Sequence, residues 1–112
     1  MAERLLWTSL ILCLFCSSTL ALEGTLLVSN RSGGSISFID LNTGVEIARV
    51  PVGPIIPHEV AVSPDGRLAL TSEYGPNDNP GRHVILMDVA TASIIGRIDL
   101  GPNSRPHTAR FL

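Results

Sequence analysis

Short stretches in which apolar and polar residues alternate make up most of the chain after residue 24. In SISFID (35–40), Ile36 and Phe38 fall on one face and serines on the other, and this period of two is typical of a β-strand. Turn-forming sequences separate such stretches, among them NRSGG (30–34), DLNTG (40–44) and SPDG (63–66). Because no segment here has the 3.6-residue period of an amphipathic helix, the pattern predicts an all-β fold.

The same pattern occurs twice. Residues 35–54 align with residues 83–102, and a Pro-His pair follows each copy. Identical residues recur at an offset of 48, or 49 for the last pair: Asp40 and Asp88, Thr43 and Thr91, Arg49 and Arg97, Gly53-Pro54 and Gly101-Pro102, Pro57-His58 and Pro106-His107. Repeats of this length are typical of propellers and solenoids.

Each repeat is expected to supply four antiparallel strands. From the innermost to the outermost, those of the complete repeat are HEVAVS (58–63), RLALTSE (67–73), HVILMDV (83–89) and SIIGRIDL (93–100). Pro51 lies in the preceding outermost strand, which should be a sheet edge because proline donates no ladder hydrogen bond. The two outermost strands should bury matched positions: Glu46, Ala48, Val50 and Val52 with Ile94, Gly96, Ile98 and Leu100. A further innermost strand should begin at His107.

The ordered motifs resemble the YVTN-type β-propeller repeat. LLVSN, SISFID, NTG, VPVG and PHEVAVSPDG follow the order of that repeat, and VILMD, IDLG and RPH repeat part of it. The chain departs from the pattern in the long stretch TSEYGPNDNPG and at Ala92, where the first copy has Gly44. The resemblance implies a ring of about seven blades, and at least ~3 repeats are normally needed for stability. We therefore expect residues 22–112 to be a partial propeller of about two blades, completed by further blades of the same protein.

The first 21 residues are expected to be a signal peptide. A short polar start with Arg4 precedes an apolar run, and a Ser/Thr segment with small residues ends at Ala21, which is the order of a cleavable secretory signal. A membrane anchor is the alternative, but a span needs about 20 apolar residues. The mature protein would then be periplasmic or secreted. Cys13 and Cys16 would leave with the signal, which excludes disulfides and thiolate metal sites from the mature chain.

Charge argues against a nucleic-acid partner. All eight basic residues are arginines, scattered singly along a chain of net charge −2. Nucleic-acid and anionic-lipid binding usually need a run or patch of basic residues. We expect neither partner, and contact with the membrane only during export.

The repeated histidines are the first candidates for a ligand site. His58 and His107 enter innermost strands, so in a closed ring they would lie near one mouth of the central channel, where imidazoles can ligate a metal or haem or act as bases. A residue that recurs in each repeat can instead serve the fold, and we favour that interpretation. Arg105 beside His107, and Tyr74 and His83 from the long stretch, complete the candidate binding residues.

The acidic residues are interpreted mainly as parts of turns. Asp40, Asp65 and Asp88 occupy turn positions where aspartate bonds nearby backbone. The carboxylates and amide of the long stretch offer oxygens for calcium, but their spacing lacks the alternation of a calcium loop. A solvated turn is favoured for these residues, which are Glu73, Asn77 and Asp78.

Two classes of function stay open. The first is a binding or scaffold module for a protein or a small ligand, with no cofactor evident. The alternative is a propeller enzyme or redox component, since the resemblance extends to lactonase-like hydrolases and to haem- or quinone-associated oxidoreductase partners. A haem or metal is an option only in that alternative, in which His58, His107 and Arg105 would act near the channel.

Overall fold

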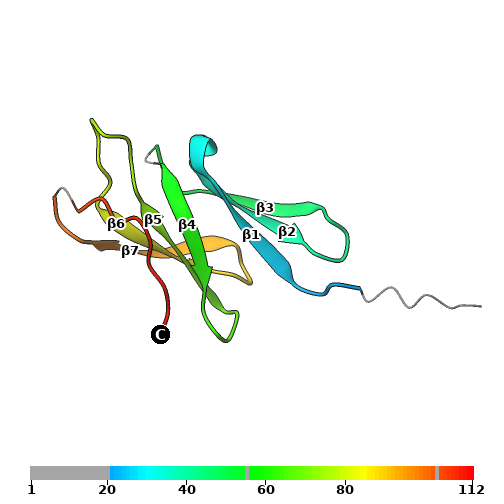
Figure 1. Ribbon diagram of the computed structural model, residues 1–112. Helices are drawn as coiled ribbons and strands as arrows, with labels where there is room; N and C mark the ends of the chain where they lie inside the picture. The colour runs from blue at the N-terminus through cyan, green and yellow to red at the C-terminus, as the bar shows by residue number, and fades with distance from the viewer. Residues whose placement is uncertain (1–20, 55, 103) are drawn as a thin grey trace, which may run out of the picture.

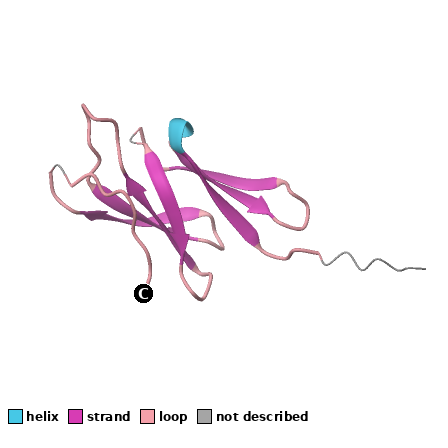
Figure 2. Cartoon of the chain, in the orientation of Figure 1, coloured by secondary structure: helices cyan, strands magenta, loops and turns pink. Residues whose placement is uncertain are grey.

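The computed structural model describes residues 21–112 except residues 55 and 103. This part of the chain is all-β, apart from one short 3-10 helix, η1 (Arg31–Gly33), as Figure 2 shows. The strands are β1 (Thr25–Asn30), β2 (Ser35–Asp40), β3 (Glu46–Pro51), β4 (Pro57–Val62), β5 (Leu68–Glu73), β6 (His83–Asp88) and β7 (Ser93–Asp99). The expected signal peptide lies outside the described residues except for Ala21. In the described part, no helix is long and apolar enough to cross a membrane.

The strands form two antiparallel sheets in sequence order, β1-β2-β3 and β4-β5-β6-β7 (Figure 1). The four-stranded sheet has the predicted strand order, and the three-stranded sheet corresponds to the last three strands of such a unit. The strand containing Pro51 lies at a sheet edge, as predicted. Two sheets do not make a ring, so the structure shows the blade-like sheets and not the closure of a propeller.

The hydrophobic core lies where the two sheets pack together. The first sheet and the residue that follows it supply Ile36, Phe38, Val50 and Val52, and the second sheet supplies Ala69, Ile85 and Met87. One face of the first sheet is therefore packed against the opposite face of the second. Burying this apolar surface is the main stabilising contribution to the pair of sheets.

The matched positions of β3 and β7 do not share a buried environment, which corrects the prediction above. Val50 and Val52 are 7% and 0% exposed, whereas their equivalents Ile98 and Leu100 are 56% and 49% exposed. Glu46, which was also expected to be buried, is exposed. The physical reason is that the second sheet covers this face of the first sheet, and no described residues cover the equivalent face of the second sheet.

The aspartates form the turns that the sequence indicates. The carboxylates of Asp40 and Asp88 accept hydrogen bonds from the backbone N–H of Thr43 and Thr91, each at 2.8 Å, and from the hydroxyls of the same threonines. These bonds favour the charged form and lower the pKa of both carboxyls below their ordinary value. Asp65 likewise accepts bonds within the SPDG turn.

Candidate functional site

Four of the five candidate residues lie together on one surface of the second sheet. The ring centroids of His58 and His107 are 4.1 Å apart, and Tyr74 meets them edge-on at 4.9 and 5.3 Å. The Arg105 guanidinium lies 4.1 Å from the centroid of the Tyr74 ring, a geometry that favours a cation–π interaction. We call these four residues, His58, Tyr74, Arg105 and His107, the histidine cluster.

The segment after β7 brings His107 and Arg105 back to β4 and β5. The Ser72 hydroxyl donates a 2.8 Å hydrogen bond to the His107 carbonyl oxygen. The backbone N–H of Arg105 donates to the Gly81 carbonyl at 2.9 Å, and its guanidinium donates to the Gly75 carbonyl at 3.3 Å. The long stretch between β5 and β6 therefore helps to position the cluster.

The innermost strand expected at His107 is not formed, which corrects that prediction. Residues 104–112 pair in no sheet, although they run alongside the second sheet (Figure 1). A strand needs a hydrogen-bonding neighbour, and none of the described residues supplies the expected one, the second strand of the next unit. Arg105 itself has a φ of +43°, a left-handed conformation that costs a non-glycine residue energy.

A β-bulge in β4 explains why two adjacent side chains reach the cluster. In a regular strand His58 and Glu59 would project from opposite faces. The pairing of β4 with β5 shifts between Pro57 and Val60, so that His58 and Glu59 together stand opposite Ser72 alone. A bulge of this kind redirects side chains. The Glu59 carbonyl at the bulge accepts a hydrogen bond from the buried Thr71 hydroxyl.

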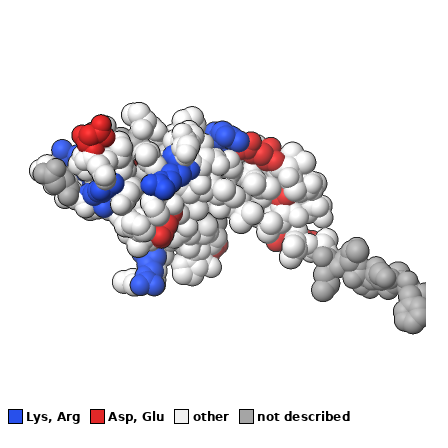
Figure 3. All heavy atoms as spheres, turned by 45° about the horizontal axis from the view of Figure 1, so that its top comes forward, with Lys and Arg blue, Asp and Glu red and all other residues white. Residues whose placement is uncertain are grey.

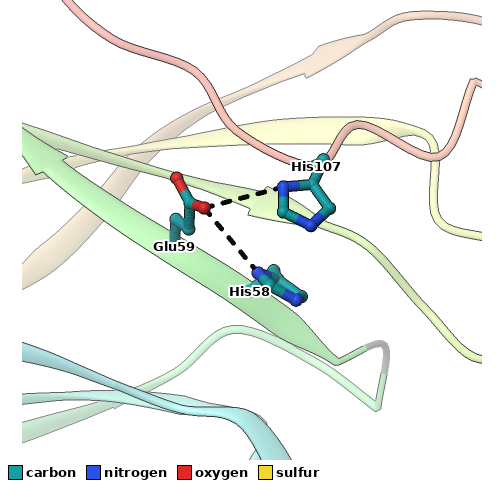
Figure 4. Close-up of side chains that lie close together, drawn as sticks. All are labelled: His58, Glu59 and His107. Carbon is teal, nitrogen blue, oxygen red and sulfur yellow. Dashed lines mark ion pairs between the residues drawn. The ribbon is translucent and has the colours of Figure 1, made fainter.

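Three side chains of this region converge on one point (Figure 4). The Nδ1 atoms of His107 and His58 lie 3.6 and 4.0 Å from the same oxygen, Oε1 of Glu59. Donor atoms of the three residues all lie within 4.8 Å of one another. Two imidazoles and one carboxylate are the donor types that a transition-metal ion prefers.

His83 contacts other residues. Its Nδ1 lies 2.7 Å from Oε2 of Glu73, whose other oxygen accepts a 2.6 Å bond from Arg97. The first sheet has an equivalent contact. Asn30 ends β1 as Glu73 ends β5, and the Asn30 amide donates a hydrogen bond to Ser35, the residue that aligns with His83. The contact of His83 thus occupies a position that the first sheet fills with an ordinary structural bond.

Glu73 is not available as a ligand for the calcium site considered in the sequence analysis. The Glu73 side chain is 6% exposed and ion-paired with Arg97, so the prediction of a solvated turn is wrong for this residue. Its carboxylate is already occupied by a guanidinium that also bonds the Val52 carbonyl of the first sheet. Asn77 and Asp78 are exposed, in agreement with the solvated turn.

Glu59 is the residue of this site that sequence reasoning missed. Its position after His58 places it, by strand alternation, on the other face. The available signal was the repeat itself, because the residue after the second Pro-His is Thr108. Because this carboxylate occurs in one copy of the repeat and not in the other, it is a candidate for a functional role and not only a structural one.

The cluster is an open surface. Within residues 21–112, apart from the two positions without description, no enclosed pocket is found. The side chains of Glu59 and His107 are 47% and 55% exposed, and that of His58 is 26% exposed. On the face drawn in Figure 3, acidic and basic groups are scattered among mostly uncharged residues. Recognition here would therefore depend on the particular groups of the cluster more than on a broad field of one sign.

Comparison with known proteins finds a likeness among solved structures. No family model and no curated protein matches the chain. A solved structure that is similar is the hydrazine synthase of Kuenenia stuttgartiensis, with a TM-score of 0.59 and 30% sequence identity. The match covers 69% of this chain and 20% of the hydrazine synthase chain, so this chain spans about a fifth of that protein's length. The likeness supports the all-β arrangement of the two sheets.

Proposed function

We propose that this chain contributes about two blades to an exported β-propeller of the YVTN type, and that the protein is a binding module for a protein or a small ligand. The observation that carries the binding role is the convergence of His58, Tyr74, Arg105 and His107 from three separate segments. Aromatic, cationic and imidazole groups on an open surface are suited to recognition.

The repeat and the burial of its matched positions support the propeller. The pairs Val50 and Ile98, and Val52 and Leu100, align at an offset of 48, yet only the first member of each is buried. The face of the second sheet that carries Ile98 and Leu100 is therefore equivalent to a face that a neighbouring sheet covers. A further sheet of the same kind would cover it in the same way.

The paired arginines support the propeller from the other side. Arg97 bonds Glu73 and reaches across to the Val52 carbonyl of the first sheet. Its equivalent, Arg49, faces no sheet among the described residues and forms an exposed pair with Glu46 on its own strand. A preceding blade would give Arg49 a carbonyl to bind as Arg97 does.

A redox or catalytic component is the second candidate. The similar structure named above is a hydrazine synthase, which is an enzyme by its name, and imidazoles at the cluster could ligate a haem or metal or act as bases. Because this chain spans only 20% of that protein's length, the likeness extends to a small part of the enzyme.

The full-length protein, purified after export, distinguishes these candidates. A binding module captures a defined partner from the envelope fraction, and Tyr74→Ala or Arg105→Ala abolishes the capture. The matched control is His83→Ala, which removes an aromatic side chain outside the cluster and should leave capture unchanged. A haem absorption band that His58→Ala removes would favour the redox component instead. Capture that survives both cluster variants contradicts the binding role.

A further inference from the structure

The carboxylate of Glu59 lies beside the histidine cluster, and recognition by the aromatic and cationic groups of the cluster does not use it. We propose that His58, Glu59 and His107 bind a divalent transition-metal ion, of which Zn²⁺ is the representative. This inference rests on the proposed binding role of the histidine cluster and names the ion through which it acts. Two histidines and a carboxylate form a three-ligand zinc set with a fourth position open.

The distances suit an ion better than they suit hydrogen bonds. The two Nδ1 atoms lie 3.6 and 4.0 Å from Oε1 of Glu59, and both separations are too long for a hydrogen bond. In a tetrahedral site with zinc–ligand distances of 2.0–2.1 Å, neighbouring ligand atoms are about 3.3 Å apart. The two separations from Oε1 therefore need to close by ~0.3–0.7 Å, and the donor atoms of all three residues lie within 4.8 Å of one another. Glu59 and His107 are about half exposed, which leaves them free to make that movement.

His58 supplies an independent observation. Its Nδ1 atom is buried and has no hydrogen-bond partner among the described residues. Buried polar atoms of native proteins nearly always have a partner, and leaving one without a partner is costly. Tyr74 and His107 pack against the ring, and Nδ1 itself is shielded from solvent. An ion held with Glu59 would satisfy the atom where it lies.

The repeat separates this metal set from the fold. The Pro-His pair recurs, so a stack of histidines could arise wherever two units adjoin. Glu59 does not recur, because Thr108 follows His107. The β-bulge that turns Glu59 toward the histidines lies at the same place in β4. The carboxylate and the bulge together make this junction between units suitable for a metal ion.

The open fourth position indicates what the ion would bind. Glu59 and His107 leave it facing solvent, where a water molecule or a donor group of a ligand can complete the tetrahedron. A carboxylate of the ligand would suit both the ion and the guanidinium of Arg105 in the same cluster. The inferred ligand class is therefore a small molecule or peptide carrying such a group.

Titration of the full chain with Zn²⁺ alone tests the inference. One Zn²⁺ per chain is expected, measured by calorimetry or by competition with a chromophoric chelator, and Mg²⁺ at the same concentration should not compete because it prefers oxygen ligands. Glu59→Gln, which conserves shape at an exposed position, should weaken Zn²⁺ by more than the roughly 10–100-fold that losing a second-shell partner costs. His58→Ala and His107→Ala should do the same, and His83→Ala, the matched histidine control, should retain the wild-type affinity.

Each outcome of these measurements supports or overturns the metal site. Absence of binding, or affinity that is unchanged by Glu59→Gln, or an equal loss in His83→Ala, overturns the metal site. Far-UV circular dichroism of Glu59→Gln, compared with wild type, separates loss of a ligand from loss of the fold. If Zn²⁺ fails to bind while partner capture still depends on Tyr74 and Arg105, the metal inference falls and the proposed function stands. If Zn²⁺ binds as expected and partner capture does not depend on Tyr74 and Arg105, the metal site stands and the proposed capture of a partner by these residues falls.

Discussion

The unequal burial of matched repeat positions leads to a quantitative prediction. Replacing both Val50 and Val52 with serine should strongly destabilise the pair of sheets, because both side chains are buried between them. Full burial of an aliphatic side chain contributes about 1.5–3 kcal/mol, so the double substitution should cost about 3–6 kcal/mol. Ile98 and Leu100 are already about half exposed. The equivalent double substitution there should cost about half as much or less.

The assay is the urea midpoint of each double variant, followed by circular dichroism. The two variants form a matched pair, since both remove two aliphatic side chains from equivalent positions in or just after the edge strands β3 and β7. We expect a much larger fall in the midpoint for Val50→Ser/Val52→Ser. Equal falls would refute the reasoning, because they would mean that Ile98 and Leu100 are packed as fully as their equivalents.

Thiol labelling gives a second measure of the same asymmetry. Residues 22–112 contain no cysteine, so one introduced thiol can be followed alone. The thiol of Ile98→Cys should react with a water-soluble reagent nearly as fast as in urea, and that of Val50→Cys should be protected. In a protein with a further blade docked on the second sheet, Ile98→Cys should become protected as well. Rapid labelling in that larger protein would contradict the proposed propeller.

Two further predictions concern the backbone and acid sensitivity. Ala92 has a φ of +47° where its equivalent Gly44 has +70°; a left-handed conformation costs a residue with a Cβ about 1–2 kcal/mol, so Ala92→Gly should raise the urea midpoint and Gly44→Ala should lower it. A lower midpoint in Ala92→Gly, or a higher one in Gly44→Ala, would contradict the proposed backbone strain. Bonds from Arg82 and from the backbone N–H of Gly101 lower the pKa of Asp99 from 3.8 to about 2. The stability that Asp99 contributes is therefore present above about pH 4 and lost as the pH falls toward 2, and thermal midpoints across that range should fall less steeply in Asp99→Asn.

Local pattern predicted the strands well because each strand carries its own alternation and each turn its own Gly, Asn or Asp. The strand order from β4 to β7 followed from the repeat and is found in the structure. The pattern could not predict that Ile98 and Leu100 would be exposed, since burial depends on a neighbouring sheet and not on the strand's own residues. The pattern also could not predict that His83 lies apart from the histidine cluster, because its contact with Glu73 depends on the register between β5 and β6.

The candidate site shows where a repeat is informative about function and where it is not. His58 and His107 were found because they recur, and recurrence is also the strongest reason to assign them to the fold. Glu59 does not recur, and the bulge that redirects it is a departure from regular pairing of β4 with β5. The bulge gives up regular backbone pairing, and a bond to a ligand would offset that cost. Nδ1 of His58, which is buried and has no hydrogen-bond partner among the described residues, is the atom that such a bond would satisfy. The residues that break the repeat, more than those that obey it, are therefore the ones to mutate first.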